Sequence, residues 1–163
     1  MRLPFFGNRR EYALEPLTIR HSAAISELHR EDFSRPWSEE EFLSLIRQNT
    51  VFGHVVRETG RKPSATVGFV LARLAAGEAE ILTVAVSRAH RRQGLGRQLM
   101  DAVLRDLHRH RAETLFLEVD EINASAIALY RKLGFHEVGK RPGYYEHPGR
   151  GRTGALIMRR ELR

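Results

Sequence analysis

The stretch Arg91-Arg92-Gln93-Gly94-Leu95-Gly96 follows a predicted strand that ends at Val86, and it opens a predicted helix. Glycine has no Cβ, so the backbone N–H groups beside it can approach a ligand closely. The first N–H groups of a helix lack intrahelical partners and carry positive partial charge. The stretch therefore predicts a site for a phosphate or a pyrophosphate, with charge-assisted contacts from the neighbouring arginines. The alternative is a glycine-rich turn into an ordinary helix.

Two familiar phosphate-binding motifs do not fit this stretch. A Walker loop requires a Gly-Lys pair followed by Ser or Thr, and no such triplet follows Gly94. The dinucleotide-binding motif requires a third glycine at position 99, which is a leucine here. A phosphorylated ligand would therefore be bound by a different arrangement.

Hydrophobic periodicity extends the prediction in both directions. Apolar residues recur every four positions from Leu95 to Leu107, which predicts a helix over Gly94–His110. A capping box at Ser38 and Glu41, with a Trp37–Phe42 hydrophobic staple, predicts the start of another helix. The other expected elements are strands Leu17–Arg20, Val51–Val56, Thr66–Arg73, Glu80–Val86, Thr114–Val119, Phe135–Lys140 and Ala155–Arg160, and helices Ser22–His29 and Ser125–Leu133.

The order of these elements predicts a mixed α/β domain. The three strands before the glycine-rich stretch follow one another closely, as in an antiparallel meander, with a turn expected over Thr59–Ser64. Strands and helices alternate after it, with Gly134 as the C-terminal cap of the second helix. A Gly/Pro-rich loop is expected between the last two strands.

Composition limits the class of protein. The 163 residues are 42% hydrophobic and include no cysteine, which fits one globular domain and excludes a disulfide scaffold or a cysteine nucleophile. No apolar run approaches the roughly 18 residues of a membrane span, and the apolar N-terminal stretch is too short for a signal peptide. The expected location is the cytoplasm, without a membrane partner.

The positive charge of the chain is concentrated in two segments. The formal net charge is +7, and residues 87–111 and 139–163 each carry a net +5. Such segments attract a phosphorylated cofactor, a nucleic acid or an acidic partner, and solvated surface is the alternative.

A carboxylate and a phenol are candidates for acid–base chemistry. Glu118 lies within the strongly apolar strand Leu115–Val119, and partial desolvation there would strengthen it as a general base. Tyr130, in the helix Ser125–Leu133, carries a phenol that can protonate a leaving group such as a thiolate. The alternatives are a glutamate on the solvent face of a sheet and a tyrosine in the core.

Other kinds of site have little support. His108 and His110 are two apart on a helix and point to different faces, so no metal site is expected. There is no Gly-x-Ser-x-Gly nucleophile elbow, and aromatic residues do not interleave with the basic segments as in an RNA-binding sheet.

Taken together, these motifs resemble the GNAT superfamily of N-acetyltransferases. The resemblance rests on Arg91-x-x-Gly94-x-Gly96, on Glu118, and on the run from Asn123 through Leu129-Tyr130 to Leu133-Gly134-Phe135. It covers about Leu17 to Leu162, and it implies one acetyltransferase domain over residues 17–162 after a leader over residues 1–16. The implied fold is a mixed, mostly antiparallel central sheet flanked by helices.

Within the superfamily, the chain resembles bacterial enzymes that acetylate the N-terminal alanine of a ribosomal protein. The cues are Pro36-Trp37-Ser38, Leu117-Glu118-Val119 and Arg141-x-x-Tyr144-Tyr145. One departure is Asp120-Glu121-Ile122, where relatives often have smaller or more polar residues.

The resemblance implies acetyl-CoA as cosubstrate, no metal, and an acceptor protein, without a requirement for nucleic acid. Glu118 would be the general base, acting through water, and Tyr130 the general acid. Trp37, Tyr144 and Tyr145 would line the acceptor cleft. The residues implied in cofactor binding are Val84, Ala85 and Val86 along the pantetheine arm, Arg91, Arg92, Gln93, Gly94, Leu95 and Gly96 around the pyrophosphate, and Asn123.

Two other functions remain open at this point. One is acetylation of a lysine or of a small-molecule amine. The other is a CoA-binding or RNA-associated module without catalysis, against which the presence of both Glu118 and Tyr130 argues.

Overall fold

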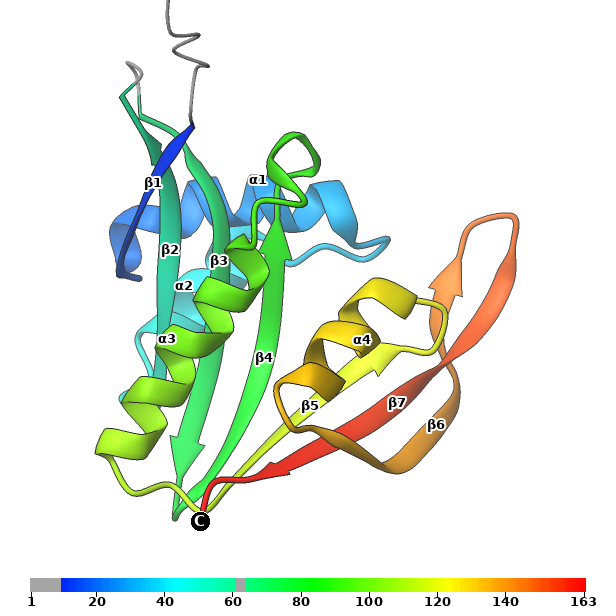
Figure 1. The fold of residues 1–163 in the computed structure, drawn as a ribbon. Coiled ribbons are helices and arrows are strands. Elements are labelled where there is room, and N and C mark those ends of the chain that lie inside the picture. The colour runs from blue at the N-terminus through cyan, green and yellow to red at the C-terminus, as the bar shows by residue number, and fades with distance from the viewer. Residues whose placement is uncertain (1–9, 61–63) are drawn as a thin grey trace, which may run out of the picture.

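The computed structural model describes residues 10–60 and 64–163, which form one seven-stranded sheet with helices on both faces (Figure 1). The strand order is β1-β2-β3-β4-β5-β7-β6, and only the β4–β5 pair is parallel. The strands are β1 (Glu11–Pro16), β2 (Val51–Thr59), β3 (Thr66–Ala75), β4 (Glu78–Val86), β5 (Thr114–Asp120), β6 (His136–His147) and β7 (Gly151–Glu161). The helices are α1 (Ser22–Asp32), α2 (Glu39–Ile46), α3 (Leu95–Arg109) and α4 (Ala124–Lys132), with short 3-10 helices η1 (Ile19–His21) and η2 (Arg88–His90).

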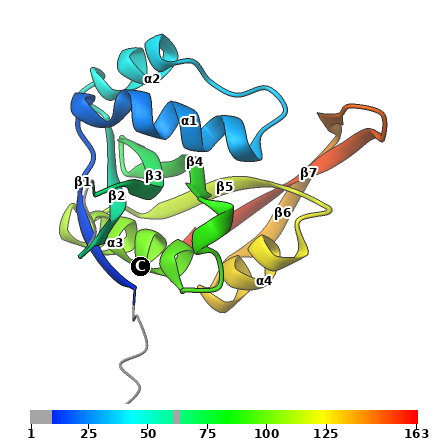
Figure 2. The ribbon, with the colours of Figure 1, turned by 90° about the horizontal axis from the view of Figure 1, so that it is seen from above.

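The helices divide into two layers, and the sheet lies between them (Figure 2). Helices α3 and α4 cover one face, where the larger core contains Leu99, Leu115 and Tyr130. Helices α1 and α2 cover the other face, where Ile25, Phe42 and Phe69 form a smaller core. The residues expected to recur along α3 are all buried, with Leu95 2% exposed and Leu99, Val103 and Leu107 fully buried. The mixed, mostly antiparallel sheet predicted from the sequence is confirmed.

The start of α2 agrees with the sequence in detail. Glu41 N–H donates to Ser38 Oγ over 3.2 Å, and Ser38 N–H donates to Glu41 Oε2 over 2.7 Å. The rings of Trp37 and Phe42 lie 5.5 Å apart, as the predicted staple requires. Local sequence is sufficient here because all the partners lie within five residues of one another.

The first strand was predicted in the wrong place. Leu17–Arg20 is not a strand: Thr18 caps η1, and its N–H donates to His21 Nδ1 over 2.9 Å. Strand β1 lies instead at Glu11–Pro16, inside the segment expected to be a leader; residues 1–9 lie outside the described part. Its residues have weak strand propensity. Pairing with β2, from Glu11↔Thr59 to Pro16↔His54, stabilises the strand.

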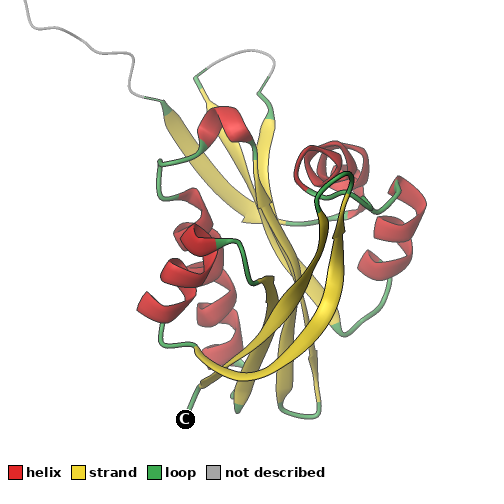
Figure 3. Cartoon of the chain, turned by 90° about the vertical axis from the view of Figure 1, so that its right-hand side faces the viewer, coloured by secondary structure: helices red, strands yellow, loops and turns green. Residues whose placement is uncertain are grey.

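The last two strands are longer than expected. The stretch between them, predicted as a Gly/Pro-rich loop, is mostly a two-stranded ribbon that extends beyond the sheet (Figure 3). We call residues 141–154 the arm. Its pairing is interrupted between Arg141 and Tyr145, where Pro142 lacks an N–H and Gly143 has φ 61°. The turn expected over Thr59–Ser64 includes residues 61–63, which lie outside the described residues.

His29 is a buried histidine at the C-terminal end of α1. It is 2% exposed, its ring stacks on Phe33 with centroids 4.0 Å apart, and its Nδ1 accepts the Trp37 N–H over 2.9 Å. Burial lowers the pKa of His29 from 6.5 to about 4, partly offset by the nearby charge of Glu41. The folded protein therefore favours the neutral form of the His29 ring.

This histidine is expected to make stability depend on pH. Because its pKa is lower in the folded than in the unfolded chain, its contribution is complete above pH 6.5 and declines as the pH falls toward 4. The loss should reach up to about 1.4 kcal/mol per pH unit in the free energy of unfolding. Urea titrations between neutral pH and about pH 4.5 should show a steeper loss for wild type than for His29→Gln, whose side chain can accept a hydrogen bond but does not titrate. Parallel pH dependences would contradict the assignment.

Candidate active site

The parallel pairing of β4 and β5 covers only three positions, from Glu78↔Thr114 to Glu80↔Phe116. Beyond Glu80, β4 continues along β3 as far as Val86, while β5 continues along β7, and the two strands diverge (Figure 1). A bulge adds to this divergence, because Leu71 pairs with Thr83 and Ala72 with Ile81. The edge of β4 over its last residues is thus open to an extended ligand, which can pair with it by backbone hydrogen bonds.

The predicted residues Val84, Ala85 and Val86 lie on this open edge. Their other edge pairs with Val70, Phe69 and Gly68 of β3, so the backbone of the segment is held in an extended conformation.

The glycine-rich stretch forms the connection from η2 to α3. Arg92 and Gly94 have left-handed backbones, with φ of 63° and 73°. The first i→i−4 bond of α3 runs from Gln98 N–H to Gly94 O over 3.1 Å, so the N–H groups of the first turn point out of the helix start. A Cβ added at Gly94 would meet no protein atom within 4 Å. The glycine is therefore required by backbone conformation and not by packing, as expected of an anion site.

The side chains of this stretch have different environments. Arg91, Arg92 and Gln93 are exposed, whereas Leu95 is buried in the core and offers only its backbone. Gly96 faces α4, where a Cβ added to the glycine would lie 3.6 Å from Leu129 Cδ2.

Neighbouring elements hold this connection from two sides. On the α1 side, the Arg91 guanidinium donates to Asp32, and Arg88 N–H donates to Glu31 Oε1 over 2.6 Å. On the β1 side, Arg10 donates to the carbonyl of Ala89 over 2.8 Å. The guanidinium of Arg91 thus helps to position the loop as well as adding charge to it.

Asn123 lies where β5 ends and α4 begins. Its Oδ1 accepts the Ala126 N–H over 3.2 Å and the Ser125 hydroxyl over 3.3 Å, so it caps the helix. The side-chain NH₂ group of Asn123 can still donate to a cofactor.

Glu118 and Tyr130 lie toward opposite faces of the sheet. Leu117 and Val119 belong to the core under α3 and α4, so Glu118, between them, faces the α1–α2 side. The Glu118 side chain is 30% exposed, and its Oε1 lies 3.2 Å from Arg141 Nε, whose charge offsets that of the carboxylate. Tyr130 is 6% exposed in the α3–α4 core, and burial raises its pKa to about 12. A partly exposed carboxylate and a buried phenol therefore lie toward opposite faces of the sheet, with Glu118 beyond the three paired positions of β4 and β5.

Tyr145, on the arm, has a perturbed pKa. The pKa of Tyr145 is raised to about 12, first by burial and then by the charge of Glu118, with smaller effects from Tyr144, Asp120 and Tyr130. The sequence predicted an acceptor-lining role for Tyr144 and Tyr145 but not this effect of Glu118 on Tyr145. Tyr144 is 52% exposed, with the Arg141 guanidinium 5.2 Å from its ring centroid.

Trp37 is held in the connection between α1 and α2, on the same side of the sheet as Glu118. Its indole stacks on His29 with centroids 4.9 Å apart. The same connection contacts the arm, because Ser34 Oγ donates to Glu146 O over 2.8 Å and Arg35 donates to Glu146 Oε2 over 2.6 Å. The residues predicted to line the acceptor cleft are therefore on two segments that touch each other.

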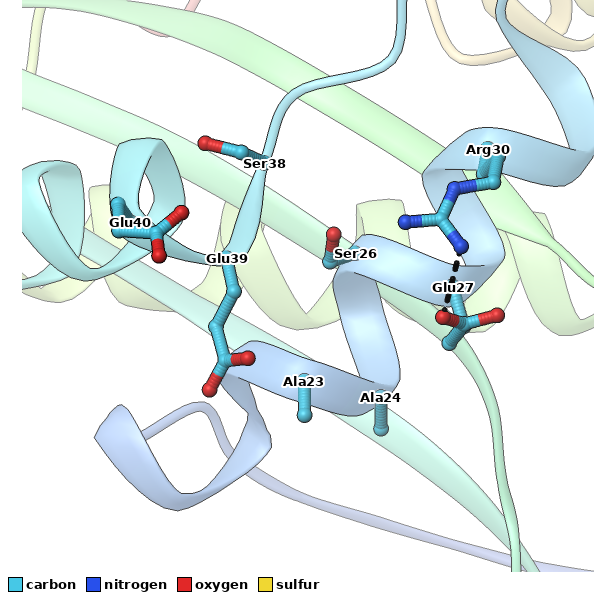
Figure 4. Close-up of a pocket in the computed structure, with 8 residues that line it drawn as sticks. All are labelled: Ala23, Ala24, Ser26, Glu27, Arg30, Ser38, Glu39 and Glu40. Atoms are coloured by element: carbon cyan, nitrogen blue, oxygen red, sulfur yellow. Dashed lines mark hydrogen bonds and ion pairs between the residues drawn. The ribbon is translucent and has the colours of Figure 1, made fainter.

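A groove of about 530 Å³ lies between α1 and the start of α2 (Figure 4). Its lining includes Glu27, Arg30 and Glu39, and none of the residues predicted for the site. The groove is therefore separate from the acid–base pair and from the glycine-rich loop.

Sequence reasoning missed several residues that shape the site. Arg141 was only part of a motif, and its pairing with Glu118 was not predicted. Asp120 was noted as a departure from relatives, without a role. Two acidic residues at the end of α1, Glu31 and Asp32, gave no signal because their partners are more than 50 residues away.

Comparison with known proteins identifies the family. Residues 22–135 match the acetyltransferase (GNAT) family. The chain belongs to this family of acetyltransferases. It is 37% identical over 123 residues to ribosomal protein bS18-alanine N-acetyltransferase of Escherichia coli, covering 76% of this chain and 79% of that protein. It is 30% identical over 142 residues to the enzyme of the same name from Haemophilus influenzae, covering 82% and 95%.

A solved structure agrees with this assignment. The ribosomal-protein-S18-alanine N-acetyltransferase of Escherichia coli superposes with a TM-score of 0.85 at 30% identity, covering 93% of this chain and 94% of that one. The protein is thus an acetyl-CoA-dependent N-acetyltransferase with the GNAT fold.

The features of this acetyltransferase fit its cosubstrate. The open edge of β4 suits an extended arm with amide groups, and the start of α3 suits a pyrophosphate. The described residues contain no group of three His, Asp or Glu side chains placed to bind a metal ion. None of the described helices combines the length and apolar character needed to span a bilayer.

Replacement of Gly94 is expected to weaken acetyl-CoA binding. Gly94→Ala puts a Cβ on a residue with φ 73°, at the loop where the pyrophosphate would lie. We expect the Kd for acetyl-CoA, measured by calorimetry, to rise about tenfold or more, a loss of roughly 1.4 kcal/mol. Gly149→Ala is the matched control, because Gly149 has φ 75° and equally open surroundings but lies in the arm. Equal Kd values for the two variants would contradict the assignment of the loop.

Proposed function

We propose that this acetyltransferase transfers the acetyl group of acetyl-CoA to the N-terminal α-amine, that of an alanine, of a ribosomal protein. The observation that carries the proposal is that Glu118 and Tyr130 face opposite sides of the sheet, with Glu118 on β5 beyond the three positions that pair with β4. The names of relatives at 30–37% identity over most of the chain support the choice of acceptor. Such an acceptor is made in the cytoplasm, and we infer that the enzyme works there.

Acetyl-CoA would bind along features already described. The backbone of Val84, Ala85 and Val86 would pair with the pantetheine arm as with an added strand. The N–H groups from Arg91 to Gly96 would surround the pyrophosphate. Asn123 would donate to the cofactor from the start of α4. Bound in this way, acetyl-CoA supplies a thioester carbon as the electrophile between Glu118 and Tyr130.

The reaction is a direct attack of the amine on the thioester. Glu118 removes a proton from the amine through a water molecule, for which its 30% exposure leaves access. A new N–C bond forms and the C–S bond breaks, while a backbone N–H near Val84 donates to the carbonyl oxygen. Tyr130 donates its proton to the departing thiolate. No covalent enzyme intermediate is needed, in keeping with the absence of cysteine.

The pKa of Tyr130 bears on its role as the acid. At about 12, it keeps the phenol protonated throughout the range in which the enzyme would operate. A thiol in water has a pKa near 8.5, so a solvated thiolate would be too weak a base to take this proton. The dry surroundings that raise the phenol's pKa also make a departing thiolate more basic, which brings the two groups closer in proton affinity.

An N-terminal amine suits this base better than a lysine does. An α-amine has a pKa near 8 and is partly neutral at pH 7, whereas a lysine amine near 10.4 is almost fully charged. Trp37, Tyr144 and Tyr145 offer aromatic surfaces on two facing segments, as a peptide end requires. Acetylation of a lysine or of a small-molecule amine is the second candidate.

The acceptor is tested with two peptides of one sequence. The first begins with a free alanine and contains one lysine, and the second differs only by a blocked N-terminus. We expect the first peptide to be acetylated at its α-amine about 10²-fold faster than the lysine of the second, in line with their neutral fractions. Mass spectrometry locates the acetyl group. Similar rates for the two peptides would instead assign the activity to lysine.

Removal of the base is expected to slow the reaction in a pH-dependent way. Glu118→Gln should lower kcat/KM at least about tenfold near pH 7, and less at high pH, where the amine is already neutral. Initial rates from pH 6.5 to 9.5 give the profile. Glu80→Gln is the matched control, because Glu80 also lies on a strand and pairs with an arginine, 3.1 Å from Arg73, but at the closed end of the β4–β5 pair. A loss of equal size at every pH would remove the base assignment.

A further inference from the structure

The end of β5 carries carboxylates that all bind the last two strands. Glu118 pairs with Arg141, while Asp120 and Glu121 bind residues further along the ribbon. Asp120 Oδ1 accepts the Thr153 hydroxyl over 2.7 Å, and Asp120 Oδ2 lies 2.8 Å from His147 Nε2. His147 Nε2 also lies 2.8 Å from Thr153 Oγ1, which closes a three-membered cluster. We call Asp120, His147 and Thr153 the clamp.

The backbone ladders do not hold the arm as firmly as they hold the sheet. The β5–β7 ladder ends at Asp120↔Ala155, followed by one backbone bond from Glu121 N–H to Gly154 O at 2.9 Å. Within the arm, pairing between Arg141 and Tyr145 is interrupted, so Tyr145 is in register only through the short ribbon that follows. Side-chain contacts are therefore needed to position this ribbon, and those at the end of β5 add to the bonds that Ser34 and Arg35 make with Glu146.

The position of the clamp suits it to hold the ribbon in place. The side chains of Asp120 and His147 are 15% and 29% exposed, so their contact is partly shielded from water and stronger than an exposed pair. Tyr145 lies two residues before His147 and pairs with Thr153, so the clamp is adjacent to it on the ribbon. Asp120 follows Glu118 by two residues and faces the same side of the sheet.

We propose that Asp120 is a positioning residue for the acceptor: through His147 and Thr153 it holds the arm, which carries Tyr145 and the Glu118 partner Arg141. The proposal rests on the proposed function, because the arm is taken as one wall of the acceptor cleft. The clamp lies far along the chain from the glycine-rich loop and shares no residue with it. Asp120 Oδ1 also accepts the Ile122 N–H over 3.2 Å, in the turn before Asn123. We therefore expect the clamp to act on acceptor binding, and variants that keep an acceptor for this N–H to leave acetyl-CoA binding unchanged.

The test compares Asp120→Ala and Asp120→Asn with the control Glu137→Ala, which removes an exposed carboxylate of β6 outside the clamp. We expect Asp120→Ala to raise the KM for an alanine-starting peptide about tenfold, as for the loss of a hydrogen bond to a charged group. In Asp120→Asn and Thr153→Val, which keep an acceptor for the Ile122 N–H, the Kd for acetyl-CoA should stay within about twofold. Asp120→Asn should recover part of the loss, because its amide oxygen can still accept from Thr153. A rise in the Kd for acetyl-CoA equal to that in the peptide KM, or no change in either, would overturn the proposal.

A second readout needs no acceptor. Hydrogen exchange over residues 141–153 should be faster in Asp120→Ala than in wild type, with no change at residues 91–98 and no change in Glu137→Ala. Unaltered exchange in the arm would overturn the clamp. Thr153→Val removes only the hydroxyl from the clamp. If Asp120→Ala does not fold, the same kinetic and exchange measurements are made on Thr153→Val. If the wild-type enzyme acetylates no peptide α-amine, the proposed function is wrong. Hydrogen exchange in the arm still decides, in that case, whether the clamp holds the arm.

Discussion

The short parallel contact between β4 and β5 is the constraint on which the site depends. Three paired positions join the two halves of the sheet, and beyond Glu80 each strand follows a different neighbour. This divergence leaves one edge of β4 free for a ligand. Glu118 lies on β5 just beyond these paired positions.

The two irregular segments beside this opening are held by side chains from distant elements. The glycine-rich loop is tied to the end of α1 through Arg88 and Arg91, and to β1 through Arg10. The arm is tied to the end of β5 by the clamp. A loop without a backbone ladder has many conformations, so such contacts are needed to keep binding groups in place.

The faces of the sheet offer different environments for proton transfer. On the α1–α2 side, Glu118 is partly exposed and has a guanidinium partner, which suits exchange of protons with water. On the α3–α4 side, Tyr130 is buried, and its raised pKa keeps its proton until a strong base develops beside it. Burial and the charge of Glu118 raise the pKa of Tyr145 on the arm.

The sequence alone determined the elements whose signals are local: the capped start of α2, the periodic helix α3 and the glycine-rich connection. Tertiary structure decided where β1 lies, how far the arm extends, and which partners Glu118, Asp120 and Arg91 take. Capping, periodicity and glycine conformation act within a few residues and so leave a pattern in the chain. Edge pairing, hydrogen bonds and ion pairs join segments up to 112 residues apart, and the sequence alone gives no sign of which segments will meet.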